Sequence, residues 1–162
     1  MAELTKLEEK LAEVIGLAQA AQTATEKVER MVEDQELAAQ LQRQREEAAE
    51  TEQRGVQLAD ARDGKKTAIL DKAQETKREA SDMMNTYLGG DSDALDGFEF
   101  LTMAEAGEVG HWEVLGKLNE SAGEEQVREL VDWALPIQER HFSEARTGSL
   151  TLAASEDPNE ES

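Results

Sequence analysis

The chain of 162 residues contains no cysteine, which excludes disulfide bonds, thiolate metal ligands and cysteine nucleophiles. Only two prolines interrupt it, so long intervals are free for helices. No apolar run approaches the roughly 20 residues that a membrane-spanning helix needs. Residues 1–10 also lack the basic-then-apolar order of a secretion signal. We therefore expect a cytoplasmic protein that does not bind membranes.

Basic residues are scarce: 17 lysines and arginines face 37 aspartates and glutamates, which gives a net charge of -20 at pH 7. The basic residues are scattered among acidic ones and form no patch. Such a surface repels nucleic acid and anionic lipid, and it concentrates cations. We expect no nucleic-acid partner. The acidic surface is compatible with simple solubility and with attraction of metal ions.

Apolar residues recur at helical spacing in every long segment, and no segment alternates like a β-strand. With short connections, this pattern predicts an all-α fold, an antiparallel four-helix bundle with an additional helix. In the first three helices, heptad spacing does not continue over enough residues to favour a coiled coil. We expect one domain over residues 1–147 and an acidic, frayed tail over 148–162. The predicted helices span 3–32, 34–61 (with Asp34 as N-cap), 65–88, 94–120 and 124–146.

The only two histidines lie on apolar stripes of the last two predicted helices. His111 follows Glu105 and Glu108 at three-residue steps, and His141 follows Gln138 at the same spacing. Residues three or four apart share a helix face, so these polar groups should point at the core. Buried carboxylates and imidazoles need a partner, and a shared metal ion is one that would satisfy them. A hydrogen-bonded core residue is the commoner role for a lone histidine such as His141.

Two glutamates of the second predicted helix are further candidates. Glu47 and Glu50 straddle the edge of its apolar stripe, and Glu50 is better placed to reach inward. Close to His111, Gly107 and Gly110 lower helix stability, which predicts close approach by a neighbouring helix or a ligand. Pro136 is predicted to kink the last helix just before the Gln138 position.

Three short motifs, in this order and spacing, resemble the ferritin-like proteins of the YciE/YciF stress-associated family. They are Ala49-Glu50-Thr51, Gly64-Lys65-Lys66 and Glu105-x-x-Glu108-x-x-x-Trp112, within a similarity covering roughly residues 10 to 145. The resemblance implies a four-helix core with a di-iron-type carboxylate centre and a loose link to stress responses. It makes Glu50, Glu105 and Glu108 ligand candidates and puts Gln138 at a carboxylate position.

The chain departs from the family pattern at three places. Residues 18–23 offer amides where a first-helix carboxylate is expected, Glu47 replaces a histidine, and Gln138 replaces a glutamate. Fewer anionic ligands weaken a site for two hard cations. A mononuclear site and a relic without metal therefore both remain open.

These observations lead to two hypotheses. The first is a ferritin-like bundle that binds one or two transition-metal ions, with iron expected, in a stress response or in iron or oxidant handling. Its predicted ligands are Glu50, Glu105, Glu108, His111 and His141. The second is a metal-free helical interaction or stress protein with a buried polar network. Neither assigns a catalytic residue, and both are compatible with a homodimer.

Overall fold

The computed structural model describes residues 2–161, and within that range the chain folds into α-helices with no β-strand. The all-α prediction with five helices is confirmed. No helix among these residues is long and apolar enough to cross a membrane. The helices are α1 (Lys6–Glu29), α2 (Gln35–Asp60), α3 (Lys66–Tyr87), α4 (Ala94–Ala122) and α5 (Glu125–Ala154).

Local capping chemistry explains where the helices begin and end. Asp34 caps α2 as predicted, because its Oδ1 accepts a hydrogen bond from the backbone N–H of Leu37 at 3.0 Å. Asp93 and Asp96 form a reciprocal capping box at the start of α4. Gly123 ends α4 with φ 67°, a left-handed conformation that favours glycine and permits the tight connection to α5.

The C-terminal end of α5 corrects the sequence prediction. The helix continues through Pro136 and reaches Ala154, whereas we predicted an end near residue 146 and a frayed tail from residue 148. A side chain at Gly148 would overlap the ring of Phe98 in α4. The extension therefore packs closely against α4 because residue 148 has no side chain.

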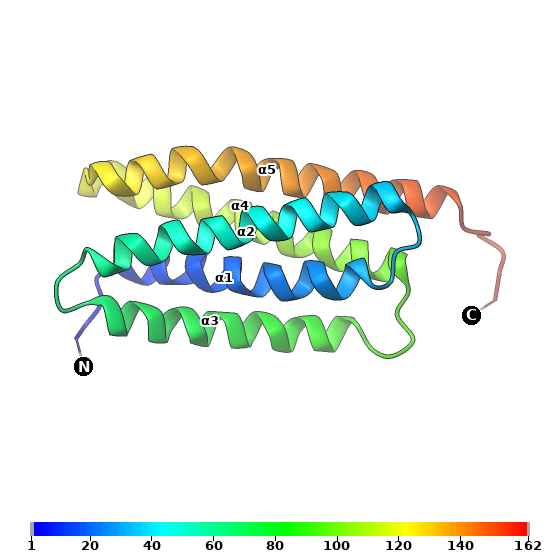
Figure 1. The fold of residues 1–162 in the computed structure, drawn as a ribbon, viewed down its shortest axis with the longest axis horizontal. Helices are drawn as coiled ribbons and strands as arrows, with labels where there is room; N and C mark the ends of the chain where they lie inside the picture. The colour runs from blue at the N-terminus through cyan, green and yellow to red at the C-terminus, as the bar shows by residue number, and fades with distance from the viewer. Residues whose placement is uncertain (1, 162) are drawn as a thin grey trace.

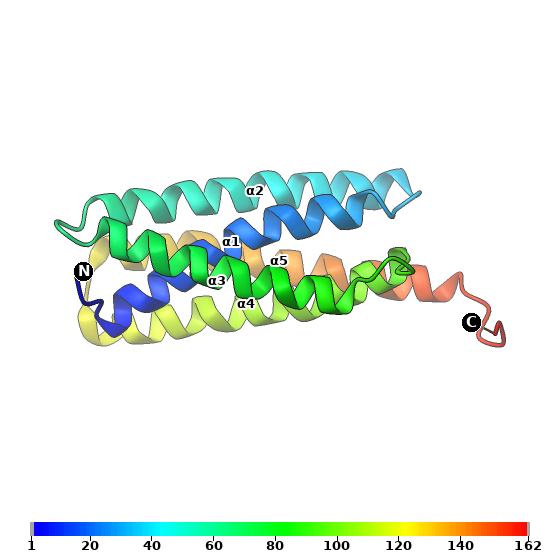
Figure 2. The same ribbon diagram turned by 90° about the horizontal axis from the view of Figure 1, so that it is seen from below.

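Successive helices run in alternating directions along a common long axis (Figure 1). α1 packs against α2 and α4, and α5 packs against α4 and α2, which closes a ring of four helices. α3 lies against the outer side of α1 and connects α2 to α4 (Figure 2). Because α3 carries the chain back along the bundle, α2 and α4 run in the same direction.

The core consists of two apolar clusters separated along the bundle. One cluster contains Trp112 of α4 and Ala134 of α5, and the other contains Leu101 of α4 and Ala145 of α5. The residues of α4 and α5 that lie between these positions include buried polar side chains. The middle of the bundle is therefore a polar layer enclosed by apolar packing at both ends.

Candidate functional site

The polar layer is built from two pairs of residues at three-residue spacing on adjacent helices. Glu105 and Glu108 lie on α4, and Gln138 and His141 lie on α5. All four are buried; Glu105 is 1% exposed. The spacing of three puts both members of each pair on the inner face of its helix. We use the term polar layer for these four residues.

Gln138 joins the two carboxyl groups of α4. Its Nε2 donates a hydrogen bond to Oε2 of Glu105 at 3.3 Å and another to Oε2 of Glu108. A primary amide carries two N–H donors, so one nitrogen can serve both acceptors. Neither carboxyl group forms an ion pair with a lysine or arginine among residues 2–161. The pair is therefore hydrogen-bonded, without a basic side chain that neutralises its charge.

The environment favours the neutral form of both carboxyl groups. Burial and, to a smaller extent, the nearby charge of Glu144 together raise the pKa of Glu105 to about 8. Burial and the charge of Glu105 raise the pKa of Glu108 well above its ordinary value, although the hydrogen bond from Gln138 opposes this shift. At neutral pH the layer therefore retains protons that exposed glutamates would have lost.

His141 connects this pair to α2. Its Nε2 lies 3.0 Å from Oε1 of Glu47, and its Nδ1 lies 3.9 Å from Oε2 of Glu105. Burial lowers the pKa of His141, although the hydrogen bond with Glu47 opposes the shift. The imidazole thus lies between the carboxyl groups of Glu105 and Glu47, and burial favours its neutral form.

Arg140 binds two carboxylates that lie outside the polar layer. It forms ion pairs with Glu47 and, at 3.0 Å, with Glu144. Burial would raise the pKa of Glu47, but hydrogen bonds from Arg140 and His141 bring it below its ordinary value. Glu47 is therefore an anion in the neutral range, in contrast to the buried pair.

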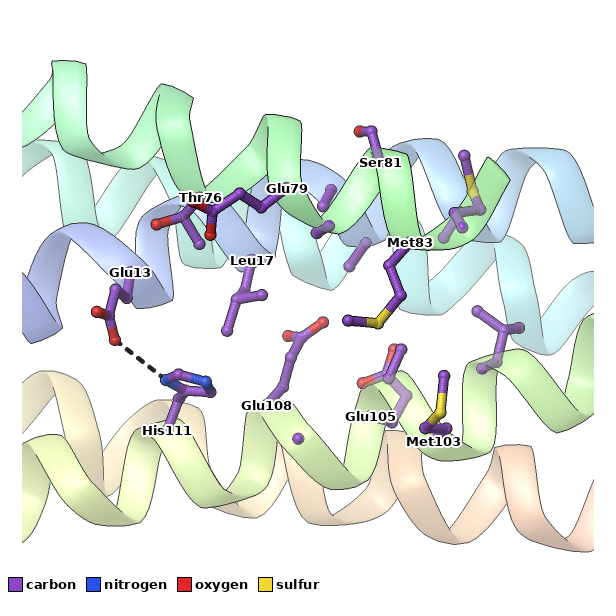
Figure 3. Close-up of a pocket in the computed structure, with 18 of the residues that line it drawn as sticks. Glu13, Leu17, Thr76, Glu79, Ser81, Met83, Met103, Glu105, Glu108 and His111 are labelled. Atoms are coloured by element: carbon purple, nitrogen blue, oxygen red, sulfur yellow. Dashed lines mark ion pairs between the residues drawn. The ribbon is translucent and has the colours of Figure 1, made fainter. Parts of the chain in front are cut away.

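A cavity of about 460 Å³ opens on the other side of Glu105 and Glu108, between α1, α3 and α4. Both carboxyl groups point from α4 into this space (Figure 3). Each uses Oε2 for Gln138, and Oε1 of each accepts no hydrogen bond from the residues that the structure describes. The pair thus contacts Gln138 on one side and faces the cavity on the other.

The structure brings together Glu105, Glu108 and His141 of the five predicted ligands. Glu50 does not join them: its side chain is 49% exposed and pairs with Arg54, one helical turn away, at 3.0 Å. Glu47 reaches inward instead. The inward orientation expected of Glu50 is therefore wrong, and the neighbouring turn of α2 supplies the contact.

His111 also lies outside the polar layer, and our inward prediction for it is wrong. Its side chain is 42% exposed, and Nδ1 lies 3.3 Å from Oε2 of Glu13 in α1. Figure 3 shows this pair at one end of the cavity. His111 lies on α4 three residues after Glu108, but its side chain faces the edge of the cavity and not the polar layer.

Gly107 and Gly110 were predicted to mark a close approach by a neighbouring helix or a ligand. A Cβ atom built on either residue would meet no atom within 4 Å, so no helix approaches there. Close helix contact occurs instead at Gly16, where a Cβ would overlap the backbone of Ala73 in α3. Gly107 lines the cavity.

Sequence reasoning ranked Glu47 too low and missed Arg140. A signal for Glu47 was present, because it lies three residues after Gln44 and four before Thr51, both buried in α2. Counting buried polar residues as part of the stripe would have placed Glu47 on the inner face. Arg140 gives no such signal, because its role depends on a contact across helices.

No three histidine, aspartate or glutamate side chains among residues 2–161 stand around a common point in a way that would hold a metal ion. The Gln138 nitrogen occupies the space between the two carboxyl groups. Carboxylate oxygens with one imidazole are nevertheless a donor set suited to a single iron or zinc ion. An amide at position 138, in place of a carboxylate, fits a second ion poorly.

No family model, curated protein or solved structure matches this chain.

Proposed function

We propose that this protein is a ferritin-like helical bundle that binds a single divalent transition-metal ion in its polar layer. Glu105, Glu108 and His141 are the ligands in this proposal, and Glu47 orients the imidazole. The observation that carries it is the pair of buried carboxyl groups, which have no lysine or arginine partner among residues 2–161, beside a buried imidazole. Iron is the metal that the resemblance to ferritin-like proteins suggests.

The electrostatics of the layer support a cation. Burial disfavours the ionised forms of both carboxyl groups, the charge of Glu105 adds to this at Glu108, and both pKa values are raised. A divalent cation would favour the ionised forms and would exchange for protons on binding. The acidic surface, with a net charge of -20, would raise the local concentration of cations around the molecule.

The contact between His141 and Glu47 suits a metal-binding imidazole. With the proton on Nε2, His141 donates to Oε1 of Glu47 at 3.0 Å and directs its Nδ1 lone pair toward Glu105. Metal-binding histidines usually donate their second nitrogen to a carboxylate or carbonyl in this manner. Arg140 would keep Glu47 anionic and fixed in this role.

The helix order supports the ferritin-like assignment. Two antiparallel pairs, α1 with α2 and α4 with α5, face each other, and a long connection joins them. Ferritin-like bundles have one such crossover and carry their ligands on inward-facing helix positions. Here α3 serves as the crossover. If iron is the bound metal, it would supply redox chemistry at a position lined by residues of α4 and α5.

Titration of chelator-treated protein with Co²⁺, followed by calorimetry and by cobalt absorption, tests this proposal. We expect a single ion per chain, with binding weakened ~10-fold or more by His141→Ala and by Glu108→Gln. The matched controls are His111→Ala and Glu50→Gln, which remove the same chemical groups outside the layer and should leave binding unchanged. Equal losses in the control variants, or metal far below stoichiometry in the wild type, would contradict the proposal.

A second function is favoured by the amide bridge. Gln138 already satisfies one oxygen of each buried carboxyl group, and a protonated pair needs no cation. This is the metal-free helical interaction or stress protein, stabilised and specified by a buried hydrogen-bond network. It predicts no saturable Co²⁺ binding at any pH where the protein is folded.

A further inference from the structure

The cavity between α1, α3 and α4 has the size of a small-molecule site. Its volume of about 460 Å³ falls within the roughly 300–1,000 Å³ typical of ligand pockets. Small residues create the space: α1 contributes alanines 20, 21 and 24, and α4 contributes Gly107, whose missing Cβ would meet no atom. α3 and α4 face each other across this space (Figure 3).

Acidic groups dominate the ionisable lining of the cavity. Lys72 is the one lysine or arginine among the described lining residues, and its Nζ pairs with Glu75 at 3.6 Å. This charge pattern complements a cationic ligand and opposes an anionic one. The acidic lining residues are Glu13, Glu79, Glu105 and Glu108.

Glu105 and Glu108 supply the polar end of the site. Both side chains are more than nine-tenths buried, and both carboxyl groups point into the cavity (Figure 3). Their Oε1 atoms accept no hydrogen bond from residues 2–161, although Oε2 of each is bonded to Gln138. Two acceptors that face the cavity are therefore available to one donor group.

Most of the remaining lining is apolar, although Thr76, Ser81 and His111 also line the cavity. Met83 of α3 and Met103 of α4 stand on opposite sides of the cavity (Figure 3), and they are 51% and 40% exposed. Methionine side chains adjust to varied apolar shapes, and exposed apolar side chains around a pocket often mark a binding site. Other apolar residues of the lining are Leu17, Met84, Phe100, Leu101 and Ala104.

We propose that this cavity binds a small organic amine, an apolar chain or ring bearing one primary ammonium group. The ammonium group donates hydrogen bonds to Oε1 of Glu105 and Glu108, and the apolar part lies against Met83 and Met103. This inference goes beyond the metal-binding function and does not require it. Because a metal ion and an ammonium group each displace protons from the same two carboxyl groups, the two ligands compete.

Calorimetric titration of the chelator-treated full chain tests the amine site with three probes of equal chain length. The probes are n-octylamine, 1-octanol and octanoate, each used well below the concentration at which it aggregates. We expect one saturable site for octylamine, roughly tenfold weaker binding of octanol, and no binding of octanoate. Equal affinity for octylamine and octanol, a preference for octanoate, or no octylamine binding would overturn the proposal.

Two variants and one control locate the site. Glu108→Gln should weaken octylamine binding roughly tenfold and leave octanol unchanged. Gly107→Leu fills the cavity and should abolish binding of both. The control, Glu113→Gln, makes the same charge change at an exposed position of α4 outside the lining and should change neither. An equal loss in Glu113→Gln would show general charge attraction and overturn the site.

The outcomes of the metal and amine experiments can be separated. Octylamine binding to a protein that takes up no Co²⁺ leaves the amine site standing and removes only the metal-binding function. Co²⁺ binding to a protein that does not bind octylamine would contradict the amine site and support the metal-binding function. Where both bind, saturating Co²⁺ should lower the apparent affinity for octylamine, and independent binding would contradict the shared carboxylate pair.

Discussion

The side-chain nitrogen of Gln138 lies 3.3 Å from Oε2 of Glu105, and the same nitrogen also donates to Glu108. The amide supplies two donors without adding a charge. A glutamate at this position would replace the two N–H donors with one O–H donor at most, present only in its protonated form, and would put a third carboxyl group in the layer. Residue 138 therefore decides whether the polar layer is stable without a cation.

The Gln138→Glu variant should separate stability from metal binding. Without metal, we expect the free energy of unfolding to fall by about 3 kcal/mol, because buried carboxyl groups lose their donor. With Co²⁺, the added carboxylate should tighten binding. Urea unfolding with and without chelator measures both effects. Gln126→Glu, at an exposed position of the same helix, is the control and should change neither.

The Glu47→Gln variant tests the proposed orientation of His141. The amide can still accept from Nε2 of His141 but no longer carries a charge that raises the basicity of the ring. We expect Co²⁺ affinity to fall by ~10-fold or more. Glu46→Gln, at an exposed position of the same helix, should leave affinity unchanged. Unaltered affinity in Glu47→Gln would mean that His141 binds no metal through Nδ1.

The helices could be predicted because their signals are local. Asp34 and Gly123 mark a beginning and an end with chemistry that each residue carries by itself. The end of α5 could not be predicted, because small residues follow Arg146 and the chain then turns acidic, which is typical of a frayed tail. The extension contacts α4 where only the folded arrangement brings the residues together: Gly148 lies against Phe98, and the hydroxyls of Ser149 and Thr102 are 3.1 Å apart.

The candidate site was predictable where a strong apolar stripe surrounded it. Glu105, Glu108 and His141 are buried as the stripes of α4 and α5 predicted. The orientations of Glu50 and His111 were mistaken: Glu50 lies at a stripe edge, and His111 is half exposed although it lies on the predicted stripe of α4. At such positions a partner decides the orientation, and the partners are Arg54 within α2 and Glu13 across from α4.

The pH dependence of stability follows from the buried pair. Glu105 keeps its proton in the folded state up to a pKa of about 8, whereas in the unfolded chain it loses the proton near 4.5. Folding thus retains protons that unfolding releases, so the free energy of unfolding falls as pH rises. His141 has a lowered folded pKa and acts oppositely, but only below its ordinary value of 6.5.

Between pH 6.5 and 8, the metal-free protein should therefore lose stability, by up to about 1.4 kcal/mol per pH unit for each group that titrates. Urea denaturation across this range measures the slope. Glu108→Gln should reduce the slope and be more stable than the wild type at pH 8. Saturating Co²⁺ should reverse the trend, since ionised carboxylates bind it better. A flat profile without metal would contradict the buried, protonated pair.

Replacement of a glycine of the bundle by alanine should raise or lower the stability of the protein, depending on the space around that glycine. Gly107 and Gly110 of α4 face open space, so replacement by alanine should stabilise the protein by roughly 1 kcal/mol each through helix propensity. Gly16→Ala should destabilise it, because the new Cβ would overlap the carbonyl oxygen of Ala73 and push α3 away from α1. Thermal unfolding of the three variants, without metal, measures these signs. Stabilisation by Gly16→Ala would mean that α3 does not pack closely on α1, and the cavity between α1, α3 and α4 would then lose one of its walls.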